Sequence, residues 1–126
     1  MASTSTPQVD SDIAERVSGL AQQIAAKIHE VLGEETRVIW FGSWVKGQAR
    51  PHSDIDLAIV AAAPLPVGAL ARLRDWIDDL PTLYTIDLVN FDEASERMQQ
   101  EILKDGVEIV PGTETRQLLK RHSTAG

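Results

Sequence analysis

The chain has 126 residues, of which 43% are hydrophobic, and it carries a formal net charge of -7. A chain of this length predicts one domain that buries about two-thirds of the surface exposed when it is unfolded. The absence of cysteine excludes disulfides and thiolate metal sites and favours a reducing compartment. The acidic balance argues against direct nucleic-acid binding, which needs a basic surface.

The beginning of the chain, residues 1–9, is small and polar and is predicted to be disordered. It lacks the basic segment and apolar core of a signal peptide, and no apolar run approaches the length of a membrane span. We therefore expect a cytoplasmic protein with no membrane contact. The folded domain is expected over residues 10–111, followed by a tail or short helix over residues 112–126.

The first half of the domain predicts a helix and two strands. Apolar residues recur at three- and four-residue intervals over residues 12–32, which indicates an amphipathic helix that ends at Gly33. A β-rich stretch follows at 36–41. The next apolar run, residues 54–60, predicts the second strand.

The second half repeats the alternation of helix and strand. Helical spacing covers residues 67–80, with Val67 and Trp76 on the buried side, and Pro81 ends that helix. A third strand is predicted at 83–90, and it is followed by a helix at 93–104 and a short strand at 107–110. This order predicts an α/β (α+β) fold in which a small mixed sheet is flanked by helices.

Two aspartates stand at the head of the second predicted strand. Asp54 and Asp56 are two residues apart, so in an extended strand their side chains point to the same face. Two bare carboxylates about 4 Å apart would repel by about 4 kcal/mol at an effective dielectric constant of about 20. A cation is therefore expected between them, and ligands that offer only oxygen suit magnesium.

A third acid, Asp87, lies in the middle of the third predicted strand. Alternation places Tyr84, Ile86 and Leu88 on one face of this strand and Thr85 and Asp87 on the other. If the second and third strands are neighbours, their apolar faces pack on the helices. The three aspartates then converge on the opposite face.

The spacing of these residues resembles a known signature. Gly42-Ser43, ten residues and Asp54-x-Asp56 match the pattern of the polymerase β-like nucleotidyltransferase superfamily, in particular its minimal nucleotidyltransferase (MNT) branch, and the resemblance covers roughly residues 36–110. It implies the nucleotidyltransferase core fold. It also implies that Gly42 and Ser43 bind the triphosphate of ATP.

The same resemblance implies the roles of the acids. Asp54, Asp56 and Asp87 would hold magnesium, with two ions expected, and Asp87 would also draw the proton from the acceptor hydroxyl. Basic residues near the same loop contact phosphate in relatives, so Lys46 is a candidate nucleotide-binding residue, although a solvated loop charge is an equal alternative. Trp44 could stack on a base, but loop tryptophans more often pack against a neighbouring element.

The resemblance also implies a partner. Stand-alone MNT proteins are typically paired with a HEPN-domain ribonuclease toxin, and they silence it by transferring AMP from ATP to a tyrosine. The expected function is therefore an antitoxin that is a protein adenylyltransferase, and a hetero-oligomer with the toxin is one expected assembly. Two alternatives stay open: an antitoxin that acts by binding alone, and a small-molecule nucleotidyltransferase whose site is completed by dimerisation.

Overall fold

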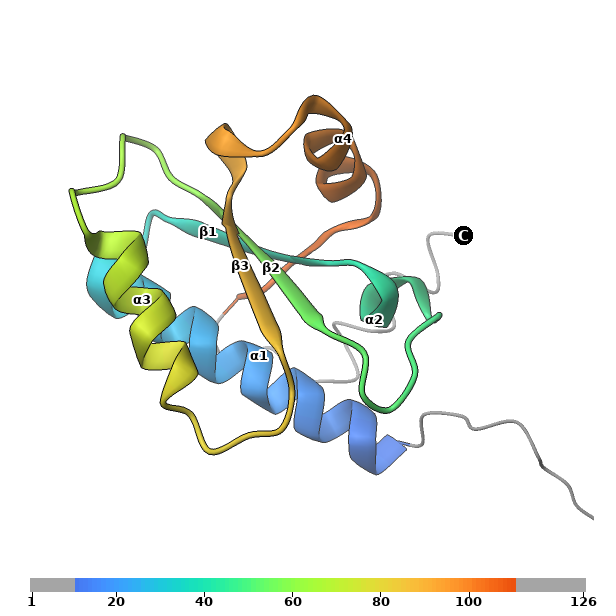
Figure 1. Ribbon diagram of the computed structural model, residues 1–126. Helices are drawn as coiled ribbons and strands as arrows, with labels where there is room; N and C mark the ends of the chain where they lie inside the picture. The colour runs from blue at the N-terminus through green and yellow to red at the C-terminus, as the bar shows by residue number, and fades with distance from the viewer. Residues whose placement is uncertain (1–10, 111–126) are drawn as a thin grey trace, which may run out of the picture.

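The computed structural model describes residues 11–110, so the predictions for residues 1–9 and 112–126 lie outside the described part. A four-stranded mixed sheet with the order β3-β2-β1-β4 forms the centre of the fold and is flanked by helices (Figure 1). The elements are α1 (Ser11–Leu32), β1 (Arg37–Phe41), α2 (Ser43–Lys46), β2 (Ile55–Val60), α3 (Ala69–Asp78), β3 (Ile86–Asn90), the 3-10 turn η1 (Phe91–Glu93), α4 (Glu96–Asp105) and β4 (Val107–Glu108). This architecture confirms the predicted α/β fold.

The strand pairing determines which residues meet at the ends of the sheet. β1 pairs antiparallel with both β2 and β4, whereas β2 pairs parallel with β3. A parallel pair needs a crossover connection, and α3 supplies it between β2 and β3. Both parallel strands therefore begin at the same end of the sheet, and this end is also where β1 finishes.

One face of the sheet packs against α1 and α3 (Figure 1). Val38 and Trp40 of β1 and Ile55, Leu57 and Ile59 of β2 are fully buried on this face. The spacing of two between them is the alternation expected of strands with one buried face. Trp40 therefore belongs to the core of the protein.

The opposite face has a smaller apolar cluster under α4. Ile39 and Phe41 of β1 and Ala58 of β2 pack there with Ile102 of α4. Gly106, directly after α4, lies so close to Ile39 that a Cβ atom at this position would overlap its side chain. The close approach lets the chain turn from α4 directly into β4.

Two predicted boundaries on the third strand and the helix after it were wrong. β3 begins at Ile86 rather than residue 83, and Leu83 is almost fully exposed. α4 begins at Glu96 rather than residue 93, because residues 91–93 form a 3-10 turn. The Ser95 hydroxyl accepts a hydrogen bond from the backbone N–H of Met98, which is the usual way a serine begins a helix.

The buried position predicted for Val67 was also wrong. Its side chain is 98% exposed, because α3 begins only at Ala69. Gly68 has a φ of 79° in the left-handed region and separates Val67 from the helix. Helical spacing extended two residues too far here, since spacing alone does not detect a left-handed residue.

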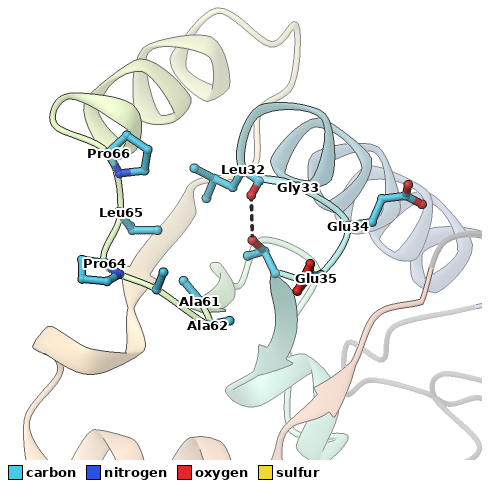
Figure 2. Close-up of a pocket in the computed structure, with 11 residues that line it drawn as sticks. Leu32, Gly33, Glu34, Glu35, Ala61, Ala62, Pro64, Leu65 and Pro66 are labelled. Carbon is cyan, nitrogen blue, oxygen red and sulfur yellow. Dashed lines mark hydrogen bonds between the residues drawn. The ribbon is translucent and has the colours of Figure 1, made fainter.

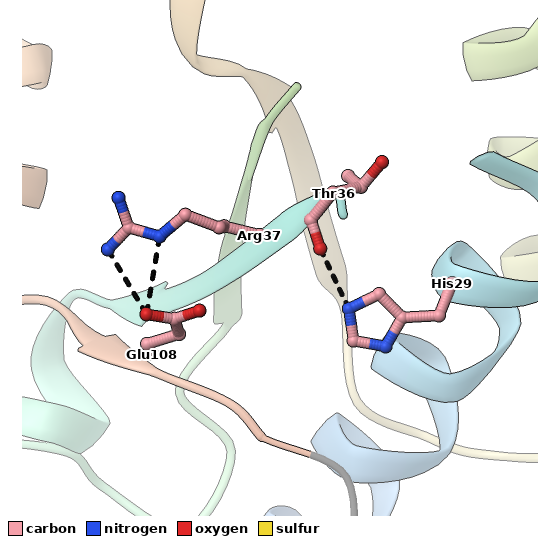
Figure 3. A network of polar contacts seen from close by, with 4 residues as sticks. All are labelled: His29, Thr36, Arg37 and Glu108. Carbon is pink, nitrogen blue, oxygen red and sulfur yellow. Dashed lines mark hydrogen bonds and ion pairs between the residues drawn. The ribbon is translucent and has the colours of Figure 1, made fainter. Parts of the chain in front are cut away.

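Polar contacts connect the start of β1 to β4 and to the end of α1 (Figure 3). The Arg37 guanidinium of β1 donates to the Glu108 carboxylate of β4, with Nη2 at 3.1 Å from Oε1. His29 near the end of α1 donates from Nε2 to the backbone oxygen of Thr36 at 2.8 Å. These contacts tie α1 and the edge strand to the start of β1.

Among residues 11–110, no helix is long and apolar enough to cross a membrane.

Candidate active site

The parallel pairing of β2 and β3 places two of the predicted acids side by side. Asp56, the second residue of β2, is the register partner of Asp87, the second residue of β3. Neighbouring strands are about 4.8 Å apart, so the two carboxylates begin from adjacent backbone positions. Asp54 is exposed and immediately precedes β2. All three acids therefore stand at the end of the sheet where the parallel strands begin.

The Gly-Ser turn lies directly against this pair. Phe41, the last residue of β1, is the register partner of Asp56, so the chain leaves β1 beside that acid. At Gly42 the backbone has a φ of 90°, and a Cβ atom would overlap the Asp56 carboxylate, coming within 3.1 Å of its Cγ. Only glycine satisfies both the conformation and the close approach. The two halves of the sequence signature therefore meet in space.

A short helix that the sequence did not predict follows the glycine. α2 is four residues long, and Lys46 donates its backbone N–H to the Gly42 oxygen at 3.2 Å. Gly47 ends α2 with a φ of 74° in the left-handed region. One turn of helix is too short to leave a periodic pattern in the sequence.

Trp44 of α2 packs inside the protein and is only 5% exposed. Its indole Nε1 donates to the backbone oxygen of Ser53 at 2.9 Å. Its ring meets Tyr84 edge to face, with centroids 6.3 Å apart and ring planes at 77°. Of the two interpretations left open by the sequence, the structure favours packing over a surface available to a base.

Lys46 is held by acids of α4. Its ammonium is 3.2 Å from a carboxylate oxygen of Glu101 and 4.0 Å from one of Asp105. The sequence pattern did not identify Glu101 as a site residue. The available signal was its position on the helix, since Met98 and Ile102 pack on the sheet and Glu101 lies on the same flank. Its importance depends on where α4 is placed, which periodicity does not specify.

Electrostatics single out Asp56 among the acids. Its half-buried position, together with the nearby charges of Asp87, Asp54 and Glu101, raises the pKa of its carboxyl from 3.8 to about 6. Burial is the largest cause, because a low-dielectric environment disfavours the charged form. A site with this excess of negative charge favours a bound cation.

The chemistry of the acids fits magnesium, provided that other oxygen ligands complete the coordination. Carboxylate oxygens are the ligands that this ion prefers, and it usually takes only one or two of them, with the remainder from phosphates and water. In the part of the chain that the structure describes, no three acidic, histidine or cysteine side chains come together closely enough to hold an ion by themselves. Asp56 with either neighbour therefore offers two carboxylates, and other oxygen ligands would have to complete a metal site.

A cavity of about 340 Å³ lies elsewhere, at the opposite end of β1 and β2 (Figure 2). Its walls come from the turn between α1 and β1 and from the loop after β2: Leu32, Gly33, Glu34, Glu35, Thr36, Ala61, Ala62, Ala63, Pro64, Leu65 and Pro66. The Thr36 hydroxyl donates to the Leu32 backbone oxygen at 3.2 Å. None of the residues around the cavity is one of the candidate catalytic acids.

Comparison with known proteins agrees with this geometry. Residues 23–115 match the family described as Polymerase beta, Nucleotidyltransferase. A Haemophilus influenzae protein named "Probable protein adenylyltransferase MntA" is 37% identical over 67 residues, which are 52% of this chain and 59% of the relative. The chain thus spans little more than half the length of that relative.

Solved structures share the fold. A chain in the crystal structure of a toxin-antitoxin with AMP-PNP has a TM-score of 0.55 and 23% identity, over 82% of this chain and 85% of that one. A chain in a mutant of the toxin-antitoxin MntA-HpeT has a TM-score of 0.51 and 26% identity, over 80% of this chain and 84% of that one. Since the family match extends over more than half of the sequence and includes the Gly-Ser turn and all three aspartates, the chain belongs to the polymerase beta nucleotidyltransferase family.

Proposed function

We propose that the protein transfers AMP from ATP to a tyrosine hydroxyl of a cognate HEPN-domain ribonuclease toxin and thereby acts as its antitoxin. The observation that carries this proposal is the meeting of the Gly-Ser turn with Asp56 beside Asp87. The Haemophilus relative is named as a protein adenylyltransferase, and the MntA-HpeT structure is a toxin-antitoxin. Both names support an antitoxin that modifies a protein.

The nucleotide would lie along the turn after β1. Gly42 is buried against the Asp56 carboxylate and shapes the turn, and Ser43 would offer an N–H and a hydroxyl to a phosphate. Lys46 would contribute positive charge from the end of α2. Because Lys46 now pairs with Glu101 at 3.2 Å, nucleotide binding would exchange a carboxylate partner for a phosphate.

Asp54, Asp56 and Asp87 would hold magnesium, and two ions are expected. Bound there, the metal supplies a positive charge that links the acids to the triphosphate and stabilises the departing pyrophosphate. The raised pKa of Asp56 supports this assignment, because a cation would stabilise the charged carboxylate that burial and the neighbouring acids disfavour. The two other acids are exposed and accessible to a ligand.

The chemical step is an in-line displacement at the α-phosphorus of ATP. The tyrosine oxygen forms a bond to this phosphorus while the bond to the bridging oxygen breaks, and pyrophosphate leaves with the electron pair. Asp87 accepts the proton of the tyrosine hydroxyl as general base. The exposure of Asp87 is consistent with an acceptor that another protein brings to the sheet edge.

Co-expression with the cognate HEPN-domain toxin tests the proposal. We expect relief of toxicity, and intact-mass spectrometry of the toxin should show added AMP on a tyrosine. The Asp54→Asn, Asp56→Asn double variant should abolish both effects. A matched control, Asp78→Asn with Asp79→Asn at the exposed end of α3, makes the same change in charge and should leave both intact.

Two other outcomes would replace this function. If the Asp54→Asn, Asp56→Asn variant protects as well as the native protein and the toxin mass is unchanged, neutralisation is by binding alone. If the toxin is unmodified but purified protein transfers AMP to a hydroxylated small molecule, the acceptor has been misassigned.

A further inference from the structure

Trp44 stands at the junction of the three segments that carry the candidate site. It directly follows Ser43 of the nucleotide-binding turn. Its indole reaches the loop that precedes Asp54, and its ring edge contacts Tyr84 just ahead of β3, the strand that carries Asp87. Ser53 is nine residues from Trp44 in the sequence, whereas Tyr84 is 40 residues away.

The hydrogen bond to Ser53 connects Trp44 to the residue that precedes Asp54. Ser53 precedes Asp54 in the chain, and its oxygen accepts the Trp44 indole N–H at 2.9 Å. The rest of this loop closes on itself, since Ser53 donates its backbone N–H to the Arg50 oxygen and its hydroxyl accepts the Arg50 N–H. The indole therefore attaches a self-contained loop to the Gly-Ser turn.

The contact with Tyr84 extends this connection to the third strand. The edge-to-face geometry, with centroids 6.3 Å apart, is a favourable arrangement for two aromatic rings. One residue further on, the Thr85 oxygen accepts the backbone N–H of Ile55 at 2.9 Å, which aligns β3 with β2. Trp44 thus contacts both the segment that leads to Asp54 and the segment that leads to Asp87.

A second buried tryptophan provides the contrast. Trp40 is fully buried in the core of the α1 and α3 face, as deeply as Trp44. Within residues 11–110 its indole Nε1 has no hydrogen-bond partner. The two residues share chemistry and burial, but only Trp44 uses its N–H to connect segments of the site.

We propose that Trp44 is a positioning residue that holds Asp54 and the Gly-Ser turn in their nucleotide-binding arrangement before the nucleotide arrives. The inference rests on the proposed function only for the identity of the ligand. Without the indole N–H, the loop of residues 50–54 would have to be ordered by the nucleotide, which weakens binding. Once the complex has formed, the acids occupy the same places, so the rate at saturation changes less than the affinity.

Matched tryptophan-to-phenylalanine variants test this inference. Trp44→Phe keeps a ring next to Tyr84 but removes the donor, whereas Trp40→Phe removes an indole N–H that has no acceptor among residues 11–110. Calorimetry with AMP-PNP and magnesium should show affinity reduced about three- to tenfold for Trp44→Phe and unchanged for Trp40→Phe. Trp76→Phe, on the outer helix α3, is a second control.

A measurement without nucleotide separates positioning from activity. Hydrogen exchange of the peptide containing residues 50–55 should accelerate in Trp44→Phe and not in either control. In the transfer reaction, KM for ATP should rise while kcat stays within about twofold of native. Tyr84→Leu, which removes the ring contact, should also weaken AMP-PNP binding, whereas Tyr84→Phe keeps the contact and should not; this pair serves if Trp44→Phe does not fold.

The outcomes distinguish this inference from the proposed function. Equal affinity and equal exchange in Trp44→Phe and Trp40→Phe would overturn the role of Trp44, even if AMP transfer to the toxin is found. Conversely, if no transfer is found but Trp44→Phe selectively weakens AMP-PNP binding and loosens residues 50–55, the positioning role stands and the proposed reaction fails.

Discussion

The two faces of the sheet differ in what they contain. Among residues 11–110, the face under α1 and α3 contributes to a cluster of seventeen buried apolar residues, whereas the cluster on the α4 face has four. The α4 face also carries Asp56, which is half-buried and faces the charge of Glu101. Along β2, residues that stabilise the core alternate with residues on the side of the candidate site: Leu57 lies in the core and Asp56 at the site. Adjacent substitutions should therefore separate stability from activity.

The largest effect is expected at Asp56. Asp56→Asn removes a charge that would bind the metal and support the triphosphate, so AMP transfer should fall about a thousandfold or more. Magnesium-dependent ATP binding, measured by calorimetry, should weaken in parallel. Circular dichroism should show an intact fold. Activity close to native would exclude Asp56 from the metal site.

Asp87→Asn should have a comparable or smaller effect of a different kind. The proposed loss is the general base, so we expect the rate to fall about a hundred- to ten-thousandfold while much of the nucleotide affinity is retained. Single-turnover kinetics with the toxin as acceptor, together with calorimetry, separate these quantities. Full activity on the true acceptor would show that the third acid is misassigned.

The complementary change on the other face is Leu57→Ala. Leu57 is fully buried in the cluster under α1 and α3, so its truncation should lower the free energy of unfolding by about 2 to 5 kcal/mol. At temperatures where the variant remains folded, the affinity for magnesium and ATP should be near native. Urea unfolding gives the first quantity and calorimetry the second. A selective loss of affinity would mean that the two faces are coupled.

The smallest effect concerns pH and the metal-free protein. The pKa of Asp56 is about 6 in the folded state against 3.8 ordinarily, so the folded state binds the proton more tightly. The contribution of Asp56 to the free energy of unfolding should therefore fall as pH rises from about 4 to about 6 and remain low above that. At pH 7.5, Asp56→Asn should be more stable than the native protein by about 1 to 2 kcal/mol, after allowance for solvent screening, and the gain should disappear below pH 4.

Urea unfolding without metal, at pH 4 and pH 7.5, measures this gain. Leu57→Ala is the control, because its destabilisation should be nearly the same at both pH values. If the difference in free energy of unfolding between Asp56→Asn and the native protein is the same at pH 7.5 as at pH 4, the charged form of Asp56 does not destabilise the fold.

The predictions that rest on the strongest local patterns in the sequence agree with the structure. The spacing of apolar residues located α1 within one residue of its observed start, and alternation assigned Leu88 to the face that is buried. The errors fell where a local pattern is weak. A single turn such as α2 has no period, and Val67 fits the helical spacing although Gly68 breaks the helix before it.

Sequence alone determined the longer helices and the strands, the faces of the strands and the candidate residues for the chemistry, because these properties depend on neighbours a few positions away. Only the tertiary structure decided that Asp56 is the register partner of Asp87 and that the backbone of Gly42 lies on the Asp56 carboxylate. The partners of Lys46 and Trp44 were likewise decided there. Each of these contacts joins segments separated by loops, and their relative placement follows from how the helices and strands pack as a whole.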